Sequence, residues 1–542
     1  MSNHLAAMAV KRFLLCAFFM FIECVVFAQQ GYYFVNFKDK DLSVLPQYRF
    51  TKRSINRRAK QNINFHYSDY PVSEKYINSI SSVLGAEFIY ASKWLNGVLI
   101  KANKALLPDI LAKDFVSDID FVGDVAPKHE AKIAMFKLNS TKDLQYNASL
   151  AQMQSMGADK MHEWGWNGKG VYIAVFDGGF EYADKSSALT SLFQEKRIKF
   201  TYNIVNNTTN VFVSSEHGTN VLSCMAAYKP DKLIGTAYGA DFALFVSEDA
   251  ENEKLVEEYN WLRAAEMADS LGVDIISSSL GYNTFDNPSE NHLLSELDGH
   301  TTIITKAAQM AARKGIVVVN SAGNNYSDVN WRNIVFPCDA DSILAVGSVD
   351  MYGVKAEFSA VGPTSDKRIK PDVVVLGKDV LVNHAENYFK TSGTSFSAPL
   401  VSGLVAGIWQ MDSLLTNIQL IKYVKQSSSL YCKPNYHLGH GIPNFVIAQQ
   451  LIKNRKERAC NLNSIEYFVY PNPVADWLQI DKEYVNLELG LDYQLLDATG
   501  LELLKGNIDS DMILNPKLDL SGLKGGVYFL KFGKKICKVM KM

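Results

Sequence analysis

The stretch GTSFSAP (393–399) leads directly into the apolar run LVSGLVAGIW (400–409). The glycine and small residues before Ser395 let the backbone approach a ligand closely. The apolar run predicts a buried helix with Pro399 in its first turn. Ser395 would then lie at the positive end of that helix, where developing negative charge is stabilised. Considered alone, the stretch is explained equally well by an ordinary Ser/Thr helix cap.

Around this helix, strands and helices alternate from about residue 146 to residue 455. Amphipathic patterns at about 254–271 and 302–314 predict helices, and short apolar runs rich in β-branched residues predict strands. The predicted strands are VYIAVF (171–176), FALFVS (242–247), VDIISS (273–278), GIVVVN (315–320) and ILAVGSV (343–349). Uninterrupted apolar strands must be covered on both faces, which predicts an α/β fold with a doubly wound, mostly parallel sheet.

Two further polar segments stand where a packed core would not place them. Asp177 follows the strand 171–176 and precedes two glycines, which puts a carboxylate on the rim where α/β folds bind ligands. His217-Gly218-Thr219 opens the helical segment NVLSCMAA (220–227). Taken singly, a turn-forming Asp-Gly explains the first segment and a structural histidine explains the second.

The three segments together supply the parts of a nucleophilic site. Serine is a poor nucleophile until a base takes its proton, and histidine suits that task near neutral pH. Aspartate can orient the imidazole and stabilise the imidazolium. Acyl transfer also needs donors for an oxyanion, and SAGNN (321–325) offers the Asn324 amide beside the Ser395 backbone N–H.

The order Asp177, His217, Ser395 resembles that of the subtilisin-like serine proteases. The segments DGG, HGT, SAGN and GTSFSAP match that family's motifs in order. The resemblance implies that Asp177 is the triad acid, His217 the general base, Ser395 the nucleophile and Asn324 the oxyanion donor. An α/β-hydrolase would need the serine first and a GxSxG elbow, and this sequence has neither.

Other segments carry the same resemblance. Ser279, Leu280 and Gly281 resemble the family's edge segment, which pairs with an extended substrate by strand addition; a simple strand end is the alternative. Tyr282 stands where many relatives have a second glycine, which leaves the shape of the P1 pocket open. In FSAVGP (358–363) the arginine of the family's frequent FSSRGP is missing.

The sequence begins with a segment typical of export. Lys11 and Arg12 precede an apolar stretch that ends at Ala28, with small residues suited to cleavage after residue 28. A membrane anchor is the alternative, but the stretch is interrupted by Glu23 and is shorter than the about 20 residues of a membrane span. With 55 basic and 57 acidic residues, the net charge of −2 argues against nucleic-acid binding.

Two smaller units flank the central α/β unit. Residues 32–125 show a small α+β pattern and resemble a subtilase propeptide, which would act as folding chaperone and inhibitor. Within them TKRSINRRAK (51–60) has five basic residues in nine, which is interpreted as a solvated helix face. The alternating tail, from YPNP (470–473) onward, predicts a small antiparallel sandwich and resembles a type IX secretion sorting domain. An accessory carbohydrate- or surface-binding sandwich is the alternative for the tail.

The cysteines and acidic residues indicate neither a disulfide framework nor a metal site. Cys432 and Cys460 could form a bridge or remain buried thiols, and Cys224 is expected in the core. No Cys/His cluster suggests zinc. Calcium is common in the family, yet the acids near Asp286, Glu296 and Asp298 are interpreted as solvated because no ligand-spaced loop stands out.

The sequence therefore predicts a secreted serine endopeptidase that is made as a zymogen. Its parts are a signal peptide (1–28), a propeptide (29–140), a subtilisin-like peptidase domain (146–455) and a sorting domain (465–542). The expected partners are protein or peptide substrates, the protein's own propeptide and the type IX machinery, without nucleic acid or an assigned cofactor. The alternative function is that of a catalytically inactive surface binding protein with the same fold.

Overall fold

The computed structural model describes residues 30–125, 149–454, 469–470, 474, 476–480, 491–508, 517–532 and 535–541. The predicted signal peptide and the polar linker at about 128–145 lie outside these residues. The chain forms two compact units, the first built mainly from residues 30–46 and 65–125 and the second from residues 47–64, 149–253 and 257–541. Within the part of the chain that is described, no helix has the length and apolar character needed to cross a membrane.

The first unit is a four-stranded antiparallel sheet with two short helices. The sheet has the order β2-β3-β1-β4 and is formed by β1 (Gln30–Phe37), β2 (Glu87–Ser92), β3 (Gly97–Asn103) and β4 (Val116–Asp124). Helices α3 (Glu74–Ser81) and α4 (Leu107–Leu111) bury Ile80 and Ile110 in its core. Leu84 is 95% exposed because α3 ends before it.

The second unit is built on a seven-stranded parallel sheet of order β13-β12-β11-β10-β5-β9-β6. Its strands are β5 (Tyr172–Asp177), β6 (Ile198–Asn203), β9 (Asp241–Val246), β10 (Ile275–Ser278), β11 (Val317–Ser321), β12 (Leu344–Val349) and β13 (Val373–Leu376). The strand order reverses at β5, which has β9 on one side and β10 on the other. Such a reversal opens a crevice at the carboxyl ends of the strands. The predicted α/β fold is confirmed.

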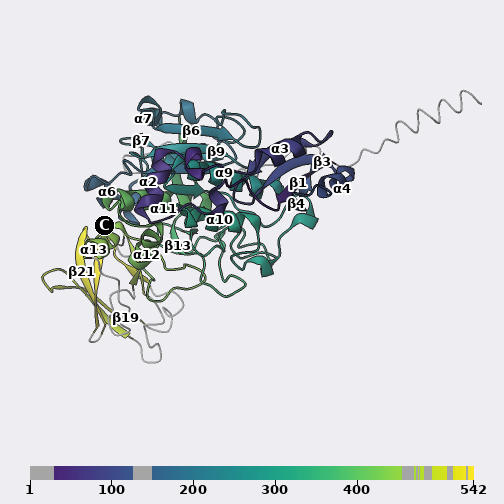
Figure 1. Cartoon of the computed structure of the whole chain (residues 1–542). Coiled ribbons are helices and arrows are strands. Elements are labelled where there is room, and N and C mark those ends of the chain that lie inside the picture. The colour runs from purple at the N-terminus through teal and green to yellow at the C-terminus, as the bar shows by residue number, and fades with distance from the viewer. Residues whose placement is uncertain are drawn as a thin grey trace, which may run out of the picture. The chain divides into compact units, whose positions relative to one another are not determined.

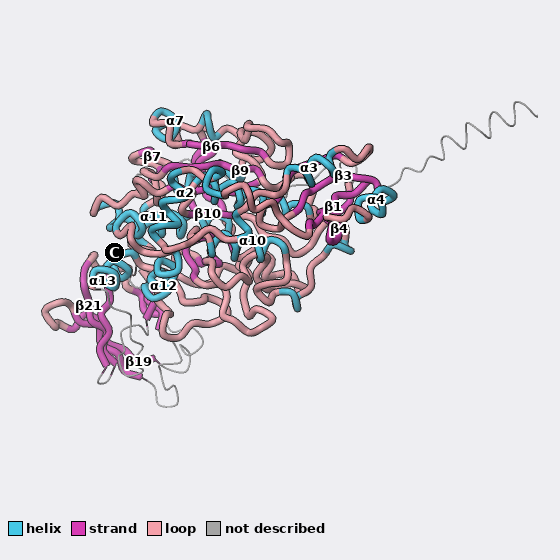
Figure 2. Tube along the Cα trace, viewed as in Figure 1, coloured by secondary structure: helices cyan, strands magenta, loops and turns pink. Residues whose placement is uncertain are grey.

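Figure 2 colours the helices of this unit cyan and its strands magenta. The helices are α5 (Leu150–Gln154), α6 (Ala158–Glu163), α7 (Thr190–Gln194), α8 (His217–Ala226), α9 (Val256–Leu271), α10 (Ile303–Arg313), α11 (Thr394–Met411), α12 (Asn417–Ser427) and α13 (Phe445–Lys453). Short strands β7 (Tyr228–Lys229), β8 (Leu233–Ile234), β14 (Val380–His384) and β15 (Asn387–Thr391) form two hairpins.

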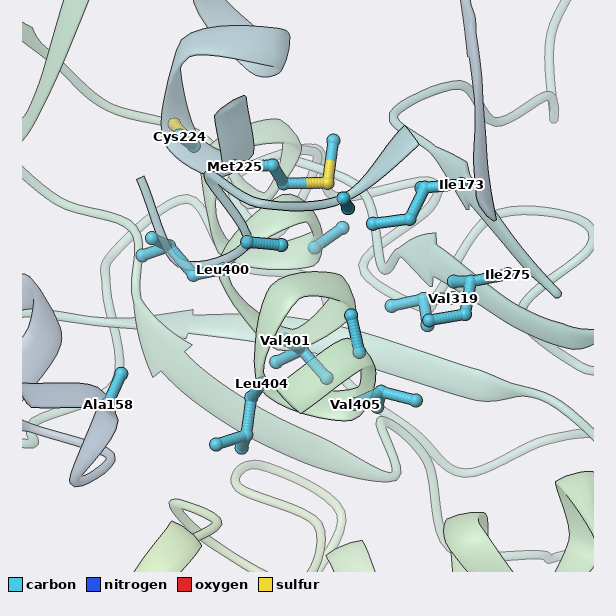
Figure 3. Close-up of a cluster of buried hydrophobic side chains, with 14 of the residues drawn as sticks. Ala158, Ile173, Cys224, Met225, Ile275, Val319, Leu400, Val401, Leu404 and Val405 are labelled. Atoms are coloured by element: carbon cyan, nitrogen blue, oxygen red, sulfur yellow. The ribbon is translucent and has the colours of Figure 1, made fainter. Parts of the chain in front are cut away.

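The core has two sides because successive strand residues point to opposite faces. Ile173, Ile275 and Val319 share a cluster with residues of α8 and α11, as Figure 3 shows. On the other face, the ring of Phe176 packs edge-on against Trp261 of α9, with centroids 5.3 Å apart. Helix α11 is buried from Thr394 to Trp409, which explains why its sequence is apolar on every side.

Residues 51–60 do not form a freely solvated helix. They form the N-cap Thr51 and helix α2 (Lys52–Lys60), which buries Ser54, Arg57 and Arg58. By its contacts this segment belongs to the second unit, and in Figure 1 the purple α2 lies among teal and green elements of that unit. The solvated interpretation is therefore wrong for the two arginines, because a carboxylate distant in sequence pairs with them.

The tail forms two small antiparallel sheets, as its alternating pattern predicts. One contains β16 (Val469–Tyr470), β17 (Trp477–Ile480) and β20 (Lys517–Asp519). The other contains β18 (Leu491–Leu496), β19 (Glu502–Ile508), β21 (Gly526–Phe532) and β22 (Lys535–Lys541). Leu478, Leu495 and Leu530 belong to a buried cluster of the tail's own residues.

Cysteines occupy buried positions in both parts of the second unit. Cys224 and Cys338 are buried free thiols and Cys537 is also buried, so the prediction for Cys224 is confirmed. Cys432 is disulfide-bonded, and Cys460, the other member of the bridge considered above, lies outside the described residues.

Candidate active site

Asp177 and His217 form a hydrogen-bonded pair at the carboxyl edge of the sheet. Asp177 ends β5, and His217 is the first residue of α8. The imidazole Nδ1 lies 2.9 Å from Oδ1 and 3.0 Å from Oδ2 of the carboxylate. Because an ionised carboxylate only accepts, Nδ1–H donates to it and Nε2 keeps its lone pair. The Asp177 side chain is 1% exposed and that of His217 is 36% exposed, so the base remains accessible.

Glycines allow these two elements to approach each other. The Gly218 N–H donates to the Gly179 carbonyl at 3.0 Å. A Cβ at Gly218 would lie 2.3 Å from that carbonyl oxygen and 2.9 Å from the Asp177 Cβ, closer than atoms can pack. The Asp177 carboxylate also accepts the Gly178 N–H at 2.9 Å, which holds its oxygens in place.

Negative charges around the imidazole favour its protonated form. Burial lowers the pKa of His217, but the Asp177 carboxylate outweighs this, with help from Glu248 and Glu216, and raises the pKa above its ordinary value. Burial, followed by the charge of Asp177, raises the pKa of Glu248 itself to about 7. Glu248 lies two residues beyond β9, the strand that pairs with β5.

Ser395 is the second residue of α11, and the residue that follows it contacts the imidazole. The ring of Phe396 packs against the His217 ring with centroids 5.7 Å apart. Ser395 is 9% exposed, and its Oγ–H donates to the Ser279 carbonyl at 3.4 Å. Its backbone N–H is among the first four of the helix, which have no partner inside a helix and create a positive potential there.

Pro399 is the sixth residue of α11, not a first-turn residue as predicted. Proline has no N–H, so position 399 cannot donate to the carbonyl four residues earlier, which is that of Ser395. The Ser279 hydroxyl donates to this carbonyl instead, at 2.8 Å in a buried position. The segment after β10 is thereby tied to the backbone of Ser395.

Asn324 follows β11 and presents its amide in a defined orientation. Its Oδ1 accepts from the Thr394 N–H and from the Thr394 hydroxyl, both at 2.9 Å. Thr394 is fully buried, whereas Asn324 is exposed. With its oxygen held by two donors, the amide directs its NH₂ group away from Thr394. A Cβ at Gly393 would lie 3.6 Å from Nδ2, which places this NH₂ beside the start of α11.

The predicted substrate edge, Ser279 to Gly281, follows β10 at the same edge of the sheet. The Leu280 carbonyl already accepts from the Asn320 amide at 2.7 Å. Tyr282 does not extend a free edge, because it pairs antiparallel with Phe336 through two 3.0 Å backbone bonds. Its ring is fully buried and stacks against Phe285.

The acids considered for calcium accept hydrogen bonds from the protein, two of them within local turns and one from a distant segment. Asp286 accepts from the Glu253 N–H, Glu296 accepts from the Leu293 N–H, and Asp298 accepts from the Thr301 N–H and hydroxyl. Across the described ranges, no three His, Cys, Asp or Glu side chains are grouped so that they could hold a metal ion.

The sequence prediction missed Thr394 and Glu248. Thr394 stood within GTSFSAP, but its tertiary partner Asn324 lies 70 residues away. Glu248 could have been found, because an acid just after a strand that neighbours β5 must lie near Asp177 at the carboxyl edge.

Comparison with known families identifies all three parts of the chain. Residues 168–441, just over half of the chain, match the model of the subtilase family. Residues 32–135 match the peptidase S8 propeptide domain of Bacteroidota, and residues 468–542 match a secretion system C-terminal sorting domain. The sorting domain indicates export, with secretion or attachment at the cell surface.

Curated relatives cover the central part. The chain is 27% identical to subtilisin NAT of Bacillus subtilis subsp. natto over 298 residues, which are 54% of this chain and 69% of that protein. It is 26% identical to a subtilisin of Bacillus pumilus over 96% of that protein, again across 54% of this chain. It is 28% identical to a thermophilic serine proteinase of Bacillus sp. (strain AK1) over 48% of this chain and 56% of that protein. The chain belongs to the subtilase family of serine endopeptidases and combines its peptidase domain with a propeptide and a secretion sorting tail.

Proposed function

We propose that this protein hydrolyses peptide bonds through a triad of Asp177, His217 and Ser395. His217 Nε2 takes the proton of the Ser395 hydroxyl as that oxygen attacks the substrate carbonyl. Asp177 holds the imidazole through Nδ1 and stabilises the imidazolium. The Asn324 NH₂ and the Ser395 N–H donate to the tetrahedral oxyanion. His217 then protonates the leaving amine, and water hydrolyses the acyl-enzyme.

The observation that carries this proposal is the double contact between His217 Nδ1 and the buried Asp177 carboxylate. It leaves Nε2 as a base on the side chain that packs against the residue after Ser395. A binding protein would not need a buried carboxylate aimed at a half-exposed imidazole beside a helix start. The extended substrate pairs with the edge of Ser279, Leu280 and Gly281, which the Ser279 hydroxyl ties to the Ser395 carbonyl.

The zymogen organisation belongs to the same proposal. Residues 1–28 direct export and are removed, residues 29–140 inhibit the peptidase domain (146–455) until they are cleaved, and residues 465–542 direct passage through the type IX machinery. Deleting 465–542 should leave activity inside the cell and abolish its release into the medium. Full release of the truncated protein would instead support a substrate-targeting role for the tail.

Labelling with a fluorophosphonate tests the triad, because this probe reacts only with an activated serine. The wild-type enzyme should be labelled and should cleave a short peptide, whereas Ser395→Ala should do neither. Loss of the triad serine in subtilisin lowers kcat by about 10⁶, and we expect a loss of that order here. Ser397→Ala is the matched control, since Ser397 is a buried serine of the same helix whose hydroxyl bonds to carbonyls of β13. Equal labelling of wild type and Ser395→Ala would refute the assignment.

A further inference from the structure

The residues that helix α2 buries against the peptidase domain are all polar or charged. Its buried residues are Ser54, Arg57 and Arg58, while its apolar residues Ile55 and Ala59 are exposed. A helix that belonged to the permanent core would bury an apolar stripe. The contacts of α2 are instead those of a docked segment. When such a segment leaves the peptidase domain, water can hydrate its polar side chains.

The two buried arginines converge on one carboxylate of the peptidase domain. The Arg57 guanidinium donates to Asp269 Oδ1 at 2.5 Å, and that of Arg58 donates to Oδ2 at 2.7 Å. The Asp269 side chain is fully buried, and those of the arginines are 3% and 2% exposed. Pairs of this kind are sensitive to truncation, because the remaining charge is left buried.

The same segment caps the carboxyl ends of two helices. The last carbonyls of a helix have no partner within it, and positive charge is favourable there. At the end of α9 and just after it, the carbonyls of residues 270–273 accept from Thr51, Arg53 and Arg57. Beyond α10, the Lys314 carbonyl accepts from Arg57 at 3.3 Å and the Gly315 carbonyl accepts from Gln61 at 2.8 Å.

The peptidase residues that contact α2 lie at the amino ends of the sheet's strands, whereas Asp177 and Ser279 lie at the carboxyl ends. They include Asp274, which precedes β10, accepts the Tyr172 N–H at the start of β5 and pairs with Arg53. The strands are parallel and four to six residues long, so about 13–20 Å separates their amino ends from the edge where the triad is assembled. Contact with α2 therefore does not depend on occupancy of the catalytic crevice.

Helix α2 does not fill the space beside it on the peptidase domain. A cavity of about 520 Å³ lies between this helix and the peptidase residues Lys169, Gly170, Val171, Trp409, Gln410, Ser413 and Leu415. Along the chain, both ends of the segment 47–64 continue into the first compact unit. The segment is thus an excursion of the propeptide that reaches the peptidase domain, not a part of the peptidase chain itself.

We propose that α2 is an anchor of the propeptide, separate from the catalytic crevice, which binds at the amino ends of the peptidase strands through Arg57, Arg58 and Asp269. This anchor keeps the propeptide bound after the chain is cut ahead of the peptidase domain. The role of the propeptide as inhibitor rests on the proposed function, but binding through α2 does not require catalysis. The two can therefore fail separately.

The test uses the full chain with two changes. Ser395→Ala removes self-cleavage, and a recognition sequence for a site-specific protease is inserted between residues 128 and 145. After cutting, the dissociation constant of the two pieces is measured by equilibrium sedimentation or by anisotropy of a labelled N-terminal piece. Arg57→Met should weaken binding by about 30-fold or more, as expected for one truncated partner of a buried charge pair. Lys60→Met, an exposed cation lost from the same helix, should change it by less than about twofold.

A second variant keeps the proposal testable if Arg57→Met does not fold. Gln61→Ala removes the bond to the Gly315 carbonyl and the acceptor of the Asn417 N–H without leaving a buried charge. It should weaken binding by about three- to tenfold. Unchanged binding in both Arg57→Met and Gln61→Ala would overturn the anchor. Absence of fluorophosphonate labelling in the wild-type enzyme would contradict the triad but not the anchor, because binding through α2 is measured in the Ser395→Ala chain.

Discussion

The bond between the Ser279 hydroxyl and the Ser395 carbonyl predicts a rescue. Ser279→Ala removes the donor that replaces the missing N–H of Pro399. Pro399→Ala restores an N–H at the position that normally donates to this carbonyl in a helix. Pro399→Ala should therefore compensate for Ser279→Ala, although the two residues lie on different elements.

The expected size of each effect follows from the burial of the carbonyl. Ser395 is 9% exposed, so leaving its carbonyl without the Ser279 donor should cost about 1–3 kcal/mol of the free energy of unfolding. Pro399→Ala alone should change the free energy of unfolding by less than about 1 kcal/mol, because two effects oppose each other. Alanine makes the unfolded chain more flexible, which destabilises the fold, and it removes the strain of a proline inside a helix, which stabilises it. In the double variant the new helical bond should recover about 1 kcal/mol, which appears as a favourable coupling energy.

The assay is urea unfolding of the four proteins in the Ser395→Ala background, which prevents autolysis. Ser402→Ala is the matched control, because Ser402 is a buried serine of α11 that bonds to Ser277 and the Ala398 carbonyl. Pro399→Ala should not rescue it. Strict additivity of Ser279→Ala and Pro399→Ala would show that the proline does not determine the partner of the Ser395 carbonyl.

Three further changes test the electrostatics and orientation of the site. Thr394→Val removes one of two donors to the Asn324 oxygen, so kcat should fall about three- to tenfold with KM nearly unchanged, and this loss should vanish in an Asn324→Ala background. Glu248→Gln removes a charge that raises the pKa of His217, so the acidic limb of the kcat/KM profile should move to lower pH; a shift to higher pH would contradict this. Burial raises the pKa of Asp372, but two lysines outweigh it and hold the pKa at about 2. This folded-state pKa is below the ordinary value of 3.8, so the ionised carboxylate stabilises the fold above pH 4. The free energy of unfolding should fall by about 2 kcal/mol as the pH drops from 4 to 2, and this fall should be absent in Asp372→Asn.

The central strands could be predicted because both of their faces are buried. VYIAVF and GIVVVN contain uninterrupted apolar residues, and the structure places β5 and β11 there. Strand β6 was missed because it lies at the sheet edge, where IKFTYN keeps half-exposed polar side chains. Its local pattern therefore does not distinguish it from a loop.

The residues proposed for catalysis could be picked out for a different reason. Asp177 directly follows one predicted strand, Asn324 lies four residues beyond another, and Ser395 lies just ahead of a predicted helix. Since parallel strands end at one edge, their positions in the sequence already imply that they meet. The supporting bonds were not predictable, because the partners of Thr394 and Ser279 depend on side-chain directions that a single sequence does not encode.

The same limit explains the error at α2. Its basic residues are interspersed with small polar ones, which is typical of a solvated helix, and no acidic residue lies within ten positions of Arg57 or Arg58 in the sequence. Their partner Asp269 is more than 200 residues away and lies in a helix whose own pattern gives no reason to bury a carboxylate. A buried carboxylate requires a cation from elsewhere. In a peptidase whose propeptide departs, Asp269 must regain water when α2 leaves, so the charge that stabilises the zymogen also makes the docked helix separable.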